Sequence, residues 1–191
     1  MKKLILRMLK PIQKFLQRIG YIESDFTVDS VNYLLSIIKA GDVLGSYESG
    51  RFTSIFIKGN YDHVAIVDSS MFVVEAVGDK FINGKNVGGV RRVPLEEWIW
   101  KKNHVFVARA NNPVIGFAAA NETKQYVGMS YDYEFSRDNE QLYCSELVYV
   151  CYKNLIPNLF NYIPANKEIL PIHYLNDKNF TIVYDSRRQI I

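Results

Sequence analysis

Cysteine is scarce in this chain of 191 residues, which contains only Cys144 and Cys151. Both lie in one apolar stretch with helical spacing, where seven residues correspond to a separation of about 10.5 Å. A disulfide requires Cα atoms within about 7 Å of each other. We therefore expect no disulfide between them, and nothing in the sequence indicates a secreted scaffold that depends on disulfides.

Long apolar segments are also missing. No apolar run approaches the roughly 20 residues that a membrane-spanning helix needs. Residues 2–7 resemble the start of a signal peptide, but Arg7 and Lys10 interrupt the apolar segment and no small-residue cleavage site follows. We expect an unprocessed, cytoplasmic protein.

Acidic residues are absent from the first 20 positions. The cations there are Lys2, Lys3, Arg7, Lys10, Lys14 and Arg18. The whole chain carries a net charge of +3, so the remainder is net negative and no surface for nucleic acid is predicted. The apolar residues of 2–19 recur at helical spacing, with Pro11 as a kink or break. This segment is either a terminal helix packed on the domain or a basic amphipathic helix that brings residues 1–20 into peripheral contact with an anionic membrane.

The remaining composition is that of an ordinary globular protein, with 48% hydrophobic and 23% charged residues. Hydrophobic periodicity predicts strands at residues 42–45, 63–67, 71–75, 89–93, 105–108 and 180–184. It predicts helices at residues 28–39, 113–128 and 142–155, and a short helix with Pro94 at its first position. Residues 46–60 are predicted to be a loop with one helical turn. This order indicates an α+β fold with helices on one side of an antiparallel sheet.

Cys144 falls at the start of the helix predicted for residues 142–155. Unpaired N–H groups and the positive end of the helix dipole favour a thiolate there, and the same N–H groups can bind an oxyanion. Cys144 shares an apolar stripe with Leu147, Val148 and Cys151, so its sulfur should face the sheet. A role in packing alone is the alternative interpretation.

The hairpin at residues 63–75 offers a partner for this cysteine. If residues 68–70 form its loop, His63 lies directly opposite Glu75, with Cβ atoms about 5 Å apart. A carboxylate at that distance can fix the tautomer of an imidazole and stabilise the imidazolium. Another loop length would change the register. The alternative is that His63 caps a strand and that Glu75 faces water at a strand end.

Four motifs follow one another along the chain. They are Gly-Asp-Val-Leu at residues 41–44, Tyr-Asp-His-Val-Ala-Ile-Val at 61–67, Val-Glu-Ala at 74–76 and Tyr-Cys-Ser-Glu-Leu-Val at 143–148. This ordered set resembles the circularly permuted NlpC-type papain-like family, in its YiiX/YebB-like branch. In that branch the histidine strand precedes the cysteine helix, which is the reverse of most papain-like enzymes. The resemblance covers residues 41 to about 177.

The resemblance implies a papain-like α+β fold, in which an antiparallel sheet or half-barrel packs against helices. We expect a catalytic domain over residues 41–191, preceded by an N-terminal helical extension over residues 1–40 that lies outside the resemblance. By the same resemblance Cys144 is the nucleophile, His63 the base and Glu75 the residue that orients the base.

The activity implied by this family is that of a cysteine hydrolase, a peptidase or amidase, that forms an acyl-enzyme. Its substrate would be a small peptide or amide, such as a cell-wall peptide, or a related acyl compound. One alternative is a lipid-directed acyltransferase, phospholipase or thioesterase on the same fold. The other alternative is a binding module that has lost its activity.

Other candidate residues have simpler explanations. His104 and His173 are interpreted as structural, and two cysteines with three scattered histidines do not make a zinc site. Gly88 and Gly89 lack the phosphate-loop pattern, so we expect no cofactor and no metal. Asp62 should point to the face opposite His63 and is left out of the triad. The tyrosines that flank the cysteine motif can line a cleft or simply pack: Tyr131, Tyr133 and Tyr143.

Overall fold

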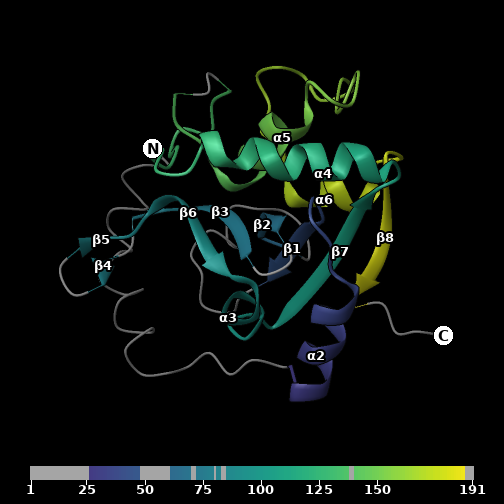
Figure 1. The fold of residues 1–191 in the computed structure, drawn as a ribbon. Coiled ribbons are helices and arrows are strands. Elements are labelled where there is room, and N and C mark those ends of the chain that lie inside the picture. Colours follow the sequence, from purple (N-terminus) through teal and green to yellow (C-terminus); the bar gives the residue numbers. More distant parts are fainter. Residues whose placement is uncertain are drawn as a thin grey trace.

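The computed structural model describes residues 26–47, 61–69, 72–79, 81–82, 85–137 and 140–187. A single large sheet forms the middle layer, with helices on both of its faces (Figure 1). The mixed α+β architecture expected from the sequence is confirmed, although the helices are not confined to one side. The predicted helix at residues 2–19 and the predicted loop from residue 48 to residue 60 lie outside the described residues.

The main sheet has six strands in the order β6-β3-β2-β1-β7-β8, and every neighbouring pair is antiparallel. Its strands are β1 (Val43–Tyr47), β2 (His63–Ser69), β3 (Phe72–Val77), β6 (Gly89–Pro94), β7 (His104–Ala110) and β8 (Phe180–Asp185). A second sheet, which the sequence did not predict, pairs β4 (Phe81–Ile82) with β5 (Lys85–Asn86). The six predicted strands are all present, and no strand end differs from the prediction by more than two residues.

The helices are shorter than the periodicity predicted. They are α2 (Val28–Ile37), α3 (Leu95–Ile99), α4 (Pro113–Glu122), α5 (Cys144–Tyr152) and α6 (Pro171–Asn176), with a 3₁₀ turn, η2, at Thr123–Gln125. Pro94 is the N-cap of α3 and not its first residue. No helix of the described segments is both long enough and apolar enough to span a membrane.

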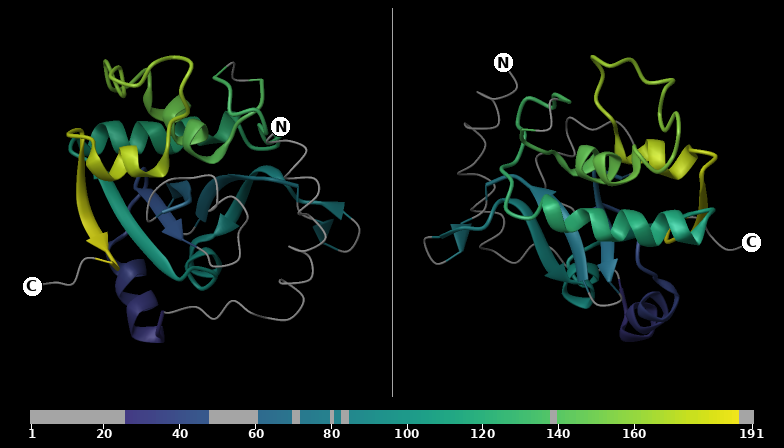
Figure 2. Two further views of the ribbon diagram at one scale, coloured as in Figure 1. Left: turned by 180° about the vertical axis from the view of Figure 1, so that it is seen from behind. Right: turned by 45° about the horizontal axis from the view of Figure 1, so that its top comes forward.

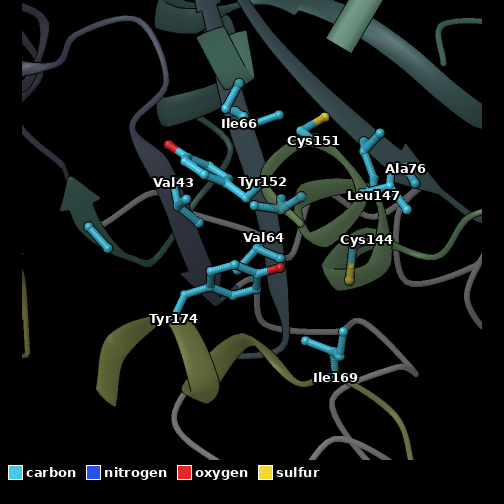
Figure 3. Packing of buried hydrophobic residues seen from close by; sticks show 14 of the residues in the cluster. Val43, Val64, Ile66, Ala76, Cys144, Leu147, Cys151, Tyr152, Ile169 and Tyr174 are labelled. Carbon is cyan, nitrogen blue, oxygen red and sulfur yellow. The ribbon is translucent and has the colours of Figure 1, made fainter. Parts of the chain in front are cut away.

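Helices α4, α5 and α6 lie on one face of the sheet, and α2 and α3 lie on the other (Figures 1 and 2). On the first face, alternate strand residues such as Val64, Ile66 and Ala76 share a buried apolar cluster with Leu147 of α5, which we call the α5-side cluster. Figure 3 shows this packing, with Cys151 at the end of α5 toward Ile66, Ala76 beside Leu147, and Cys144 at the opposite end of the helix. Helix α5 therefore runs along β2 and β3 with its first turn over the end at which β2 begins.

The opposite face of the sheet carries a second buried cluster, which we call the α3-side cluster. It joins the intervening strand residues, such as Ala65, Val67 and Val73, to Leu34 of α2 and Trp98 of α3. Because both faces of β2 are buried, its sequence is a continuous apolar run and not an alternating one.

The register of the β2–β3 hairpin differs from the prediction. Ile66 pairs with Val74 and Val67 with Val73. The register of the hairpin then shifts once, between Val67 and Ser69. This register places Ala65 across from Glu75, so His63 is not directly opposite Glu75 as predicted. The predicted loop at residues 68–70 was wrong because β2 continues to Ser69 and contains this irregularity. The observed register differs from the predicted one by two residues. Because this is an even number, His63 and Glu75 still share one face of the sheet.

Candidate active site

His63 and Glu75 form a buried hydrogen-bonded pair. His63 is the first residue of β2, and its Nε2 lies 2.8 Å from Oε2 of Glu75 on β3. The two residues are 4% and 1% exposed, so the alternative of a Glu75 facing water is wrong. The sheet thus brings together two of the three residues that the sequence analysis proposed for the site.

Three elements supply donors to the Glu75 carboxylate. Arg91 of β6 donates from both Nε and Nη2 to Oε1, at 3.0 and 2.6 Å. Trp98 of α3 donates its indole N–H to Oε2 at 2.8 Å, beside the His63 nitrogen. Lys102, which is 2% exposed, follows α3 and places its ammonium group 4.7 Å from the centre of the Trp98 ring. One oxygen is therefore held by the arginine, and the other is shared by the imidazole and the indole.

These contacts determine the ionisation of Glu75. Burial by itself raises the pKa of the carboxyl, but the hydrogen bond and charge of His63 and the charges of Lys102 and Arg91 lower it, and the net pKa lies well below the usual range. Glu75 is therefore a carboxylate at neutral pH. A carboxylate bonded to Nε2 favours the tautomer that carries its proton on Nε2 and leaves Nδ1 as the basic nitrogen.

Cys144 is the first residue of α5. Its N-cap, Tyr143, has an extended backbone and makes no side-chain hydrogen bond to the first turn. Two further contacts hold this helix end in place: the Tyr143 hydroxyl accepts the N–H of Ile169, and the Tyr174 hydroxyl donates to the carbonyl of Ser145. Cys144 is 4% exposed and belongs to the α5-side cluster, as its position on the apolar stripe predicted.

Cys144 and His63 lie at the same end of the sheet but on different sides of it. Cys144 packs in the α5-side cluster, while the His63 ring lies 6.4 Å from the ring of Trp98, a member of the α3-side cluster. His63 is the first residue of β2, so its pair with Glu75 lies at the end where this strand begins. A reaction that uses both residues therefore has to take place around this end of β2.

The second cysteine has different surroundings. Cys151 lies two turns along α5 and is 1% exposed, and it forms no disulfide with Cys144, as expected. Burial raises the pKa of the Cys151 thiol far above its ordinary value, with a smaller contribution from the charge of Glu122. A thiol that stays protonated is a poor nucleophile, so Cys151 is a packing residue.

The remaining sequence candidates have structural contacts. His173 accepts the backbone N–H of Leu170 through Nδ1 and thereby caps α6, as its structural interpretation predicted. Tyr131 and Tyr133 pack edge to face at 5.0 Å. Asp62 lies just before β2, where it is buried and its backbone N–H donates to the carbonyl of Ser46.

The contacts of Arg91 and Trp98 with Glu75 were not predicted from the sequence. Arg91 is the cross-strand partner of Glu75 in the β3–β6 pair, a relation that requires the register across an intervening segment. Trp98 reaches the site because α3 follows β6 directly and turns back over the sheet. No spacing in the sequence indicates either contact.

The described segments contain no group of three or more His, Cys, Asp or Glu side chains placed to hold a metal ion. The surroundings of Glu75 also do not suit a cation, because both of its oxygens already accept hydrogen bonds and two of the neighbouring groups are positively charged.

A fold with a histidine strand, a carboxylate on the next strand and a later cysteine helix is that of a papain-like protein with permuted chain order. A comparison with known families matches residues 37–170 to the family described as "Permuted papain-like amidase enzyme, YaeF/YiiX, C92 family". This match covers well over half of the chain, and the protein belongs to that family, as the four motifs predicted.

Two individual proteins are similar to this chain. The "Uncharacterized protein YiiX" of Escherichia coli (strain K12) is 33% identical over 78 residues, which are 37% of this chain and 37% of that protein. The crystal structure described as "metalloprotein yiiX from Escherichia coli O157:H7" matches with a TM-score of 0.59 at 20% identity, over 77% of this chain and 97% of that one. The second likeness supports the fold, and the chain spans little more than a third of the curated relative that it matches in sequence.

Proposed function

We propose that this protein is a cysteine hydrolase that cleaves an amide bond, with Cys144 as nucleophile, His63 as base and Glu75 as the residue that orients the base. The observation that carries the proposal is the buried hydrogen bond between His63 and Glu75, which lies at the end of the sheet where α5 begins with Cys144. The description of the family as amidases favours an amide over other acyl bonds.

In the proposed reaction, Nδ1 of His63 takes the proton of the Cys144 thiol, and Glu75 stabilises the imidazolium that results. The thiolate attacks the carbonyl carbon of the substrate, and the first N–H groups of α5 stabilise the oxyanion. The imidazolium then donates its proton to the leaving nitrogen as the C–N bond breaks. Water attacks the thioester with His63 as its base, which releases the acid and restores the thiol.

The nucleophile can be tested without the natural substrate. Treatment with p-nitrophenyl acetate at neutral pH should transfer an acetyl group to Cys144, which peptide mapping by mass spectrometry would locate. Cys144→Ala should not be acetylated at this helix, whereas Cys151→Ala should react like the wild type. An acetyl group on Cys151 would contradict the assignment. A protein that is not acetylated at all would favour the inactive binding module.

A second candidate function is the cleavage of a lipid-acyl bond, and it rests on the six cations without an acid in residues 1–20. Near an anionic bilayer each such cation contributes about 1 kcal/mol to binding. The full chain and a chain without residues 1–20 should then differ in flotation with phosphatidylserine liposomes, and the binding should weaken as salt rises. Equal behaviour of the two chains would remove this candidate and leave the amide.

A further inference from the structure

The Glu75 carboxylate is surrounded by more donors than a triad needs. Besides His63 it binds Arg91 from β6 and Trp98 from α3, so donors from three elements converge on two oxygens. A glutamate side chain otherwise has several rotamers of similar energy, and holding it in one of them costs conformational entropy. We propose that Arg91 and Trp98 are positioning residues: they hold the carboxylate in one orientation against His63, and Arg91 limits how strongly that carboxylate draws a proton to the imidazole.

The orientation follows from the way the oxygens are divided. Both donors of Arg91 bind Oε1, which turns Oε2 toward His63 and Trp98. Trp98 is 1% exposed, and its buried N–H needs an acceptor. Rotation of the carboxylate would therefore break contacts with the arginine, the indole and the imidazole together.

The charge balance gives Arg91 its second role. The charged groups that act on Glu75 come from each element around it: His63 from β2, Arg91 from β6 and Lys102 from the segment after α3. A buried carboxylate with no cation besides the imidazole would favour the imidazolium strongly. Arg91 neutralises part of that charge, so His63 can release a proton as well as accept one, as a base that also acts as an acid must.

This inference rests on the proposed function, but its test requires no turnover. The chain contains three histidines, and NMR titration of their ring protons gives each pKa, with the His63 signal identified by its loss in His63→Gln. Arg91→Gln should raise the pKa of His63 by about one unit, which is tenfold in proton affinity. Arg91→Lys, which keeps the charge, should stay close to the wild type.

The matched control is Arg109, which pairs with another buried carboxylate and has the same side-chain exposure of 25% as Arg91. Arg109→Gln should leave the pKa of His63 unchanged. An unmoved or lowered pKa in Arg91→Gln, or equal shifts in the two variants, would overturn the inference.

Trp98→Phe provides a second test, which remains available if Arg91→Gln does not fold. Phenylalanine keeps most of the packing but removes the indole N–H, so Oε2 would accept from His63 alone. The proton affinity of His63 should then rise about threefold, and an unchanged value would contradict the role of Trp98. The two proposals can fail separately. If the pKa of His63 shifts as predicted but p-nitrophenyl acetate does not acetylate the protein, the proposed activity is refuted and the effect of Arg91 on the imidazole stands.

Discussion

Two buried carboxylates, Glu75 and Asp42, each bind one arginine, and they use their oxygens differently. Arg109 spreads its donors over both oxygens of Asp42, at 2.8 and 2.6 Å, and also donates to the carbonyl of Ile37. Arg91 places both donors on one oxygen of Glu75. The two side chains are similarly buried, Glu75 at 2% and Asp42 at 1% exposed, so the difference lies in what the second oxygen does.

The Asp42 pair is a structural clamp. Its second oxygen also accepts the backbone N–H of Lys39, so the pair ties the end of α2 to β7. In the Glu75 pair the second oxygen faces an imidazole and an indole. The comparison shows that one kind of ion pair, at one level of burial, ties two elements together in one place and leaves an oxygen bonded to an imidazole in the other.

The largest effect should be on acyl transfer. Glu75→Gln keeps the size of the side chain but removes the charge that stabilises the imidazolium, so the rate of Cys144 acetylation should fall by about 10- to 100-fold. Asp42→Asn, which changes the other carboxylate in the same way, should alter the rate by less than about threefold. Equal losses in the two variants, measured by stopped-flow release of p-nitrophenol, would remove the distinction between the pairs.

For the free energy of unfolding, the change at the Asp42 pair should have the larger effect and the change at the Glu75 pair the smaller one. Arg109→Gln leaves the Asp42 carboxylate buried without its bidentate partner and should lower the free energy of unfolding by about 3 kcal/mol. Arg91→Gln should cost about 1–2 kcal/mol, because His63 and Trp98 still bind the Glu75 carboxylate. Urea denaturation of the two variants beside the wild type measures both values, and a larger loss in Arg91→Gln would reverse our assignment of roles.

The pH dependence of stability measures the contribution of the ionised Glu75 side chain. Since its folded pKa lies below the ordinary value of 4.5, the unfolded chain binds the proton more readily. The ionised group therefore stabilises the fold above about pH 4.5, and this contribution is lost as the pH falls through the folded pKa. The difference in melting temperature between wild type and Glu75→Gln should be largest near pH 7 and should shrink toward pH 3. A difference that grows on acidification would contradict the lowered pKa.

The smallest effect on stability should come from an exposed ion pair, which shares only its charges with the Arg91–Glu75 and Arg109–Asp42 pairs. Lys101 and Glu97 form an i,i+4 pair whose side chains are 52% and 53% exposed. Lys101→Gln should change the free energy of unfolding by about 0.3 kcal/mol, because water screens the pair. A loss comparable to that of Arg109→Gln would show that burial does not distinguish these pairs.

The sequence predicted the parts of this molecule that depend on local periodicity. The six strands of the main sheet and helices α2, α4 and α5 follow from spacing alone, but the ends of the helices do not, because tertiary contacts decide where a last turn stops. The pairing of His63 with Glu75 was found despite a wrong register, since a two-residue slip keeps both side chains on one face. A one-residue slip would have separated them.

The contacts of Glu75 with Arg91 and Trp98 were beyond sequence reasoning. The first depends on the register between β3 and β6, whose connection contains the small β4–β5 sheet. The second depends on the direction in which α3 leaves the sheet. Neither contact is encoded in residue spacing. The sequence therefore indicated the candidate residues His63, Glu75 and Cys144 but not the side chains that hold Glu75 in place.

The position of the histidine strand ahead of the cysteine helix has a consequence for how the chain folds. His63 and Glu75 are 12 residues apart in a hairpin, whereas Cys144 reaches this end of the sheet only when α5 packs on it from far along the chain. Local pairings have a small loop-closure cost and form early, while distant ones form late. A chain emerging from the ribosome therefore contains both members of the imidazole–carboxylate pair well before Cys144, the proposed nucleophile, has been synthesised. Activation of the thiol as proposed would then have to wait until most of the domain is complete.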